Sequence, residues 1–264
     1  MVDLGAQIVK HGKTHPAAKE GRAAGGGCST FPERPASNLV LIGTVHGDPW
    51  GYDRVGRLLR WLQPEVVTVE ISRFSLRYRE AWEARWRRRL QKSLAELPRA
   101  AAVHPAIQMV AAQIALPCEY RAARDYSGKY GITCLPLDLG AVARRHLPRY
   151  DRELLSPANL RALAGEPREG LEDWVSREFH QARLALAHSP WRLALGAHAE
   201  TMRREFFVCR RLKRLAMKGS RIVHLGGWEH LVPWRQGEGL RAWLAEADPG
   251  VLLADEADAL PGAG

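Results

Sequence analysis

Asn38-Leu-Val-Leu-Ile-Gly43 is a short apolar run that contains β-branched residues and ends in glycine, which is typical of a buried strand. Between Asp53 and Leu62, apolar residues recur on one face of a predicted helix, and Pro64 marks its end. Val66-Val-Thr-Val-Glu70 then predicts a second strand. The order strand, helix, strand predicts a β-α-β unit, in which parallel strands are joined by a right-handed crossover.

Helical and strand patterns alternate along the rest of the chain. We expect helices over about 72–97 and 105–128, a strand over 132–137, helices through 140–218, a strand over 221–226 and a last helix near 238–247. This alternation predicts an α/β fold with a central mixed or mostly parallel sheet built from β-α-β units, and a large helical insertion at about 140–218. Residues 1–36 are expected to form a flexible leader and 255–264 a frayed tail, which leaves one domain at 37–254.

The composition indicates a globular protein with a basic surface. The chain has 264 residues, 46% of them hydrophobic and 26% charged, and a formal net charge of +10, which excludes a collagen-like or mostly disordered chain. No apolar run reaches the roughly 18 residues that a membrane span needs. The beginning of the sequence lacks the apolar region of a secretory signal, and the four cysteines lie far apart. We therefore expect a cytoplasmic protein with reduced thiols and no membrane span.

One pattern occurs twice in the chain. Gly43-Thr-Val-His46-Gly-Asp-Pro49-Trp50 and Gly227-Trp-Glu-His230-Leu-Val-Pro233-Trp234 both read G-x-x-H-x-x-P-W, and each follows an apolar strand. A duplicated turn accounts for the glycine, the proline and the tryptophan. It does not account for a histidine at the C-terminal side of a strand, where open α/β sheets bind their ligands. We therefore predict that His46 and His230 are site residues.

Carboxylates follow two of the other predicted strands. Glu70 ends the second strand, and Asp138 follows the third. Because an ionised carboxylate is costly to bury alone, Glu70 is expected to face a cation, a histidine or solvent, and we expect it to neighbour His46 across the sheet edge. The alternatives are a salt bridge to Arg73 or a helix-capping role for Glu70, and a helix-capping role for Asp138.

Two histidines and one carboxylate are a common set of ligands for a divalent metal. Imidazole suits Zn, Co, Ni or Fe, whereas additional oxygen ligands favour Mn or Mg. Three protein ligands leave an open position for a water molecule whose pKa the metal lowers. In the metal-free alternative, one histidine is a general base beside a carboxylate.

Five pieces of the sequence carry a resemblance to a known family: Leu41-Ile-Gly-Thr-Val-His46, Pro64-Glu-Val-Val-Thr-Val-Glu-Ile-Ser-Arg73, Glu119-Tyr-Arg-Ala-Ala123 with the later Leu137-Asp138, Arg204-Glu-Phe-Phe-Val-Cys209 and Gly227-Trp-Glu-His230. In this order they cover most of residues 38–235, and together they resemble the TraB/PrgY–Tiki superfamily. In the fourth piece, Arg203 is the alternative to Arg204 as the matching arginine. The resemblance implies a fold shared with erythromycin esterase-like (EreA) and ChaN-like proteins. This sequence differs from many members of the superfamily because it lacks their membrane segments.

The resemblance also implies an activity. It points to a metal-dependent hydrolase, peptidase-like or esterase-like, in which metal-activated water attacks a carbonyl of a peptide or small-molecule substrate. It implies His46, Glu70 and His230 as ligands of Mn, Co or Zn. It also implies that Glu70 or a histidine transfers protons, with Glu119 and Arg204 in supporting roles, Arg204 by stabilising the oxyanion. The alternatives are a non-catalytic metal- or haem-binding protein on the same scaffold and a basic interaction module.

The segment 73–99 is strongly basic, with nine basic and three acidic residues. Its aromatic residues Phe74, Tyr78, Trp82 and Trp86 recur every four positions and form one stripe, which predicts that they pack into the core. The arginines then form the exposed face of the 72–99 helix. An acidic partner or substrate is expected to dock there in preference to nucleic acid.

Overall fold

The computed structural model describes residues 34–188, 199–233 and 237–261. Its α/β fold is built on a central sheet with the strand order β3-β2-β4-β1-β5. The strands are β1 (Leu39–Thr44), β2 (Val66–Val69), β3 (Thr133–Pro136), β4 (Ile222–Gly227) and β5 (Gly250–Leu253). Every pairing in this sheet is parallel. The prediction of an α/β fold is therefore confirmed, and the sheet is wholly parallel rather than mixed.

Helices flank both faces of the sheet. The α-helices of the described residues are α2 (Gly51–Leu62), α3 (Arg73–Leu94), α4 (Pro105–Ile114), α5 (Cys118–Tyr130), α6 (Ala141–His146), α7 (Pro157–Gly165), α8 (Leu171–His188), α9 (Ala199–Ala216) and α10 (Leu240–Trp243). Right-handed crossovers between parallel strands place α2 and α5 on one face and α9 and α10 on the other. The packing agrees, because α2 contacts α5 and α9 contacts α10.

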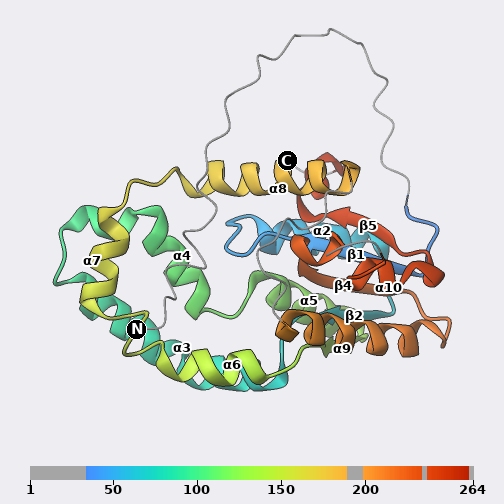
Figure 1. Cartoon of the computed structure of the whole chain (residues 1–264), viewed down its shortest axis with the longest axis horizontal. Helices are drawn as coiled ribbons and strands as arrows, with labels where there is room; N and C mark the ends of the chain where they lie inside the picture. The colour runs from blue at the N-terminus through green and yellow to red at the C-terminus, as the bar shows by residue number, and fades with distance from the viewer. Residues whose placement is uncertain (1–33, 189–198, 234–236, 262–264) are drawn as a thin grey trace, which may run out of the picture.

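The described residues form two hydrophobic cores. The larger one contains the buried strand residues Leu41, Ile42 and Val67 and the helices that cover the sheet. The smaller one is purely helical and is built around Trp86, which is 1% exposed, and Leu155. Figure 1 shows α3, α4 and α7, which contribute to this second core, lying beside the sheet layers rather than over them.

Helix α3 begins where the sequence predicts and buries part of its aromatic stripe. The hydroxyl of Ser72 caps the helix by accepting a hydrogen bond from the backbone N–H of Ser75 (3.0 Å). Trp86 is fully buried, and Trp82 is half-buried and packs against the same core. Tyr78 stacks on Trp82 with ring centroids 5.5 Å apart. The aromatic side chains therefore hold α3 to the helical core, as the four-residue spacing indicates.

Two predicted helices differ from the structure. The helix expected over 105–128 is broken into α4 and α5, because Pro117 restricts the residue before it to extended conformations and then begins a new helix. The last helix, expected near 238–247, is reduced to the single turn α10 and a 3-10 turn. Asp248 ends this segment with a positive φ of 41°.

The C-terminal segment holds two elements that the sequence did not predict, the second of them largely within the tail expected to fray at 255–264. Gly250–Leu253 forms the edge strand β5, which the sequence did not reveal because it opens with glycine and holds one β-branched residue, Val251. The 3-10 helix η5 (Ala254–Ala259) follows it, with Ala257 fully buried. Asp258 forms ion pairs with Arg54 and Arg57 of α2, at 2.6 Å each. These contacts hold the segment against α2.

Three further expectations concern the N-terminal leader, membrane-spanning helices and the helical insertion. The predicted leader at 1–36 lies outside the described residues, apart from its last three positions. Within the described ranges, no helix combines the length and the apolar character needed to cross a membrane. The helices α6 to α9 lie between β3 and β4 in the sequence, which is the place expected for the helical insertion.

Candidate functional site

The candidate site lies at the edge of the sheet where the strands end. Because all five strands are parallel, their C-terminal ends meet at one edge. The four predicted ionisable residues follow four of these strands: His46 after β1, Glu70 after β2, Asp138 after β3 and His230 after β4. Each of them therefore leaves the sheet on the same side.

The strand order corrects one expectation about this edge. Strand β4 lies between β2 and β1, so the neighbour of Glu70 is the second G-x-x-H turn and not His46. The backbone N–H of Glu70 donates to the carbonyl of Leu225 in β4 (2.8 Å). The crossover from β1 to β2 passes over a strand that arrives much later in the chain, which no local pattern around Glu70 reveals.

His230 lies between two carboxylates. Its Nε2 is 2.8 Å from Oε1 of Glu70, and its Nδ1 is 2.6 Å from Oε1 of Glu205. Glu205 is a buried residue of α9, 2% exposed, and its other oxygen accepts a hydrogen bond from the backbone N–H of Leu240 (3.2 Å). Both nitrogens of the ring and both oxygens of Glu205 are thus engaged, which fixes the orientation of the imidazole.

Arg204 joins Glu70 to Asp138. Its guanidinium donates to Oε1 of Glu70 at 3.0 Å, and through two nitrogens to both oxygens of Asp138 at 2.8 and 3.0 Å. Such a two-pronged contact is the strongest geometry for an arginine–carboxylate pair. The exposed neighbour Arg203 makes no such contact among the described residues, so the geometry selects Arg204 as the arginine at this edge.

Gly226 leaves room for the side chains of Glu70 and His224. A Cβ there would lie 2.8 Å from Oε2 of Glu70 and 3.4 Å from Nε2 of His224. His224 is buried in β4, and its Nδ1 lies 2.9 Å from the hydroxyl of Thr68 in β2. The ring of His224 therefore lies beneath the Glu70 carboxylate as part of the floor of this edge.

The charges of the cluster shift the pKa values of its members in opposite directions. Burial alone would raise the pKa of Glu70, but the charge and hydrogen bond of His230, together with Arg204, lower it to about 2. Burial alone would lower the pKa of His230, but Glu70 and Glu205 raise it to about 9. Burial lowers the pKa of His224 to about 4, which keeps that ring neutral. The result is an ionised Glu70 facing a protonated His230.

His46 has different surroundings. It is exposed, and among the described residues it makes no hydrogen bond or ion pair with Glu70 or His230. Desolvation by the protein around the ring lowers the pKa of His46, Glu119 opposes this, and Arg79 adds to it. Glu119 lies at the start of α5, where its Oε2 accepts a hydrogen bond from Sγ of Cys118 (3.3 Å).

The predicted site residues therefore fall into two groups. Glu70, Arg204 and His230 are in direct contact, and Asp138 joins them through Arg204. His46 and Glu119 lie in the other group, where Glu119 acts on His46 through its charge. Among the described residues, no set of three or more histidine, cysteine, aspartate or glutamate side chains has an arrangement able to hold a metal ion.

Two participants were not identified from the sequence. Glu205 directly follows Arg204, and only the orientation of α9 in the folded chain shows that both side chains reach the same edge. His224 is two residues before Gly226 in β4, and its position in an apolar strand does not distinguish it from an ordinary core histidine. Its alternation with Gly226 and its pairing with Thr68 are the signals that place it under Glu70.

Comparison with known proteins does not assign the chain to a family. No protein-family model matches the sequence, and no curated protein matches it either.

Proposed function

We propose that the chain is a metal-dependent hydrolase of the TraB/Tiki type, peptidase-like or esterase-like, with its centre at the Glu70–His230 pair. The observation that carries the proposal is the position of His230 between Glu70 and Glu205. A carboxylate on one ring nitrogen is the usual way in which proteins orient a histidine that binds metal through the other nitrogen. Glu205 makes that contact on Nδ1, and Nε2 faces Glu70.

The donor chemistry of this pair fits a first-row divalent metal. An imidazole nitrogen and a carboxylate oxygen are suitable ligands for Mn, Co or Zn. In this proposal a metal would replace the proton on Nε2 of His230, because imidazole binds metal only when neutral. Nε2 of His230 and the carboxylate of Glu70 would then be two ligands, and His46, from the same edge of the sheet, would be the third. When bound, the metal would supply a water molecule of lowered pKa and polarise the substrate carbonyl.

The residues of the chain itself have distinct tasks in this proposal. Glu70 is held ionised with a pKa of about 2, so it can accept a hydrogen bond from water or from a substrate N–H group. Arg204 is held by both oxygens of Asp138, and its guanidinium also contacts the carboxylate of Glu70. A fixed guanidinium there would stabilise the negative charge that develops on a carbonyl oxygen.

The experiment combines metal analysis with turnover. Protein purified without an affinity tag is equilibrated with Mn, Co or Zn, its metal content is measured, and it is assayed on a panel of peptides and esters. The variants are Glu70→Gln and His230→Gln. His188→Gln, at an exposed histidine of α8, is the matched control.

We expect about one metal ion per chain and metal-dependent hydrolysis in the unchanged protein and in the control. Both site variants should lose most of the metal and the hydrolysis while keeping their helical circular dichroism. Metal bound in stoichiometric amount without turnover would instead support the non-catalytic metal-binding alternative. Absence of bound metal from all four proteins would overturn the proposal.

A further inference from the structure

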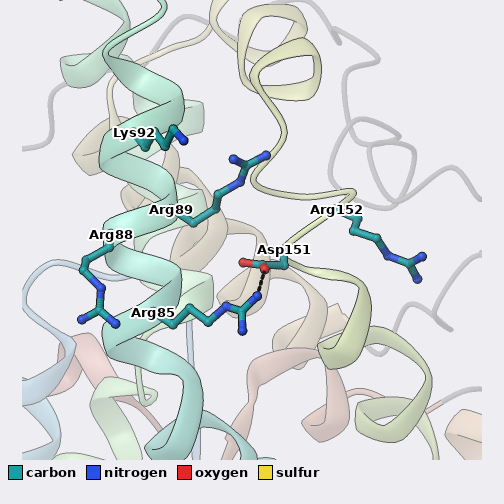
Figure 2. A pocket seen from close by; sticks show the side chains of 6 residues that line it. All are labelled: Arg85, Arg88, Arg89, Lys92, Asp151 and Arg152. Carbon is teal, nitrogen blue, oxygen red and sulfur yellow. Dashed lines mark hydrogen bonds and ion pairs between the residues drawn. The ribbon is translucent and has the colours of Figure 1, made fainter.

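A basic groove lies on the helical part of the molecule, away from the sheet edge. It has a volume of about 570 Å³ and lies between α3 and the turn at 151–152. Figure 2 shows Arg85 and Arg89 reaching from α3 toward the turn that carries Asp151. The residues that line it are Arg85, Arg88, Arg89, Lys92, Asp151 and Arg152.

The positive charge of the groove follows from helical spacing. Positions 85, 88, 89 and 92 have the i, i+3, i+4 and i+7 spacing that places side chains on one face of a helix. The opposite face of this part of α3 carries Trp86 and Leu90, which are buried in the helical core. The core contact of α3 therefore directs its four cations outward together.

Only one of these cations is neutralised by the groove itself. Arg85 forms an ion pair with Asp151 at 2.9 Å. Arg89, Lys92 and Arg152 form no ion pair among the described residues. A concentration of unpaired positive charge raises the local concentration of anions and attracts acidic partners.

The details of the groove favour an acidic peptide over nucleic acid. A carboxylate, that of Asp151, already binds Arg85, so the groove accepts this group. The second oxygen of Asp151, Oδ1, is buried and has no hydrogen-bond partner among the described residues. Because this oxygen is enclosed by the protein, a docked partner meets the cationic side chains of Arg89, Lys92 and Arg152 rather than Asp151.

The aromatic residues of α3 support the same choice. Single-stranded nucleic acid is bound by stacking its bases on accessible aromatic rings. Here Trp86 is buried, and Tyr78 and Trp82 stack on each other against the helical core. The face of Trp82 is further covered by the guanidinium of Arg85, 4.6 Å from the ring centre.

We propose that this groove docks a short, extended, glutamate- or aspartate-rich segment of a partner protein. Arg85 to Lys92 spans about 10 Å of helix, which about three residues of extended chain would match. The carboxylates of the segment bind Arg89, Lys92 and Arg152, which the groove leaves without an acidic partner among the described residues. The proposal does not depend on the hydrolase centre at the sheet edge.

The test uses the full chain and three fluorescent probes: an eight-residue glutamate peptide, the matching glutamine peptide and a single-stranded DNA of the same charge. Their affinities are measured by fluorescence anisotropy. The groove variant is Arg89→Ala with Lys92→Ala and Arg152→Ala, and it leaves the Arg85–Asp151 pair in place. The control removes the same charge elsewhere: Arg73→Ala, Arg77→Ala and Arg210→Ala, all at exposed positions.

The glutamate peptide should bind the unchanged protein in preference to both other probes, and more weakly as salt rises. The groove variant should lose roughly tenfold in affinity for it, because three charge contacts disappear, and the control should lose no more than about twofold. Equal losses in both variants would overturn the proposal, as would binding of the glutamate peptide no tighter than that of the glutamine peptide. Tighter binding of the DNA would also overturn it, in favour of a nucleic-acid surface.

Discussion

The two G-x-x-H turns have the same spacing and leave neighbouring strands at the same edge, yet their histidines differ. His230 is half-buried and lies between Glu70 and Glu205, whereas His46 is exposed and lacks such contacts among the described residues. The difference lies in the neighbouring elements. Strand β4 has Glu70 beside it from β2 and Glu205 above it from α9, whereas the outer neighbour of β1 is β5, which ends in Leu253.

The comparison shows that the motif delivers a histidine to the edge and that other segments decide its charge. A carboxylate on each ring nitrogen raises the pKa of His230 to about 9. The pKa of His46 is lowered instead, chiefly by desolvation. The same four-residue pattern thus gives a positively charged histidine in one place and a neutral one in the other.

The largest effect should come from removing the arginine that holds the carboxylates. Arg204→Ala leaves Glu70 and Asp138 without their shared cation, and we expect a loss of about 3–5 kcal/mol in the free energy of unfolding. Urea denaturation measures it. Arg203→Ala, at the exposed neighbouring position, should change stability by less than about 0.5 kcal/mol. Equal effects at 203 and 204 would contradict the assignment of Arg204 to this edge.

A smaller effect is expected from the histidines themselves. His230→Ala leaves the Glu205 carboxylate without its imidazole partner, which should cost about 2–3 kcal/mol. His46→Ala at the exposed turn should cost less than about 0.5 kcal/mol. Chemical denaturation at pH 7 compares the two variants. A larger cost at position 46 would show that the two turns have been assigned the wrong way round.

The stability that His230 contributes to the folded chain should depend on pH. The folded-state pKa of His230 is about 9, above the ordinary value of 6.5, so its protonation stabilises the folded chain. This contribution is fully present below pH 6.5 and is lost as the pH rises to 9. The stability gap between the unchanged protein and His230→Ala should therefore shrink over that range. A gap that stays constant from pH 6 to pH 9 would mean that His230 is not charged at neutral pH.

Much of the fold follows from local sequence. The apolar runs before Gly43 and at 66–69 mark two strands of the sheet, and the aromatic spacing of α3 predicts its packing. Strand β5 did not stand out, because it opens with Gly250 and holds a single β-branched residue, Val251. The helix predicted near 238–247 was too long, since α10 is a single turn. The position of β4 between β2 and β1 depends on pairing between distant segments, which no local pattern encodes.

The sequence predicts the candidate site only in part, because contacts between distant segments complete it. A glutamate or a histidine at the end of a strand can be read from the sequence, so Glu70 and His230 were identified. Which side chains of α9 face the edge depends on how that helix is rotated about its axis, which the local sequence does not give. In the structure both Arg204 and Glu205 face it. The separation of His46 from the Glu70–His230 pair arises from the strand order, which is a property of the whole sheet.

The most direct test of the central claim, that His230 is the histidine fixed within a carboxylate network, is an NMR titration of the imidazole nitrogens in metal-free protein. Resonances are assigned with His46→Gln and His230→Gln. The account predicts a pKa of about 9 for His230 and a pKa below 6.5 for His46. Titration of both rings near 6.5, or of His46 above His230, would contradict it.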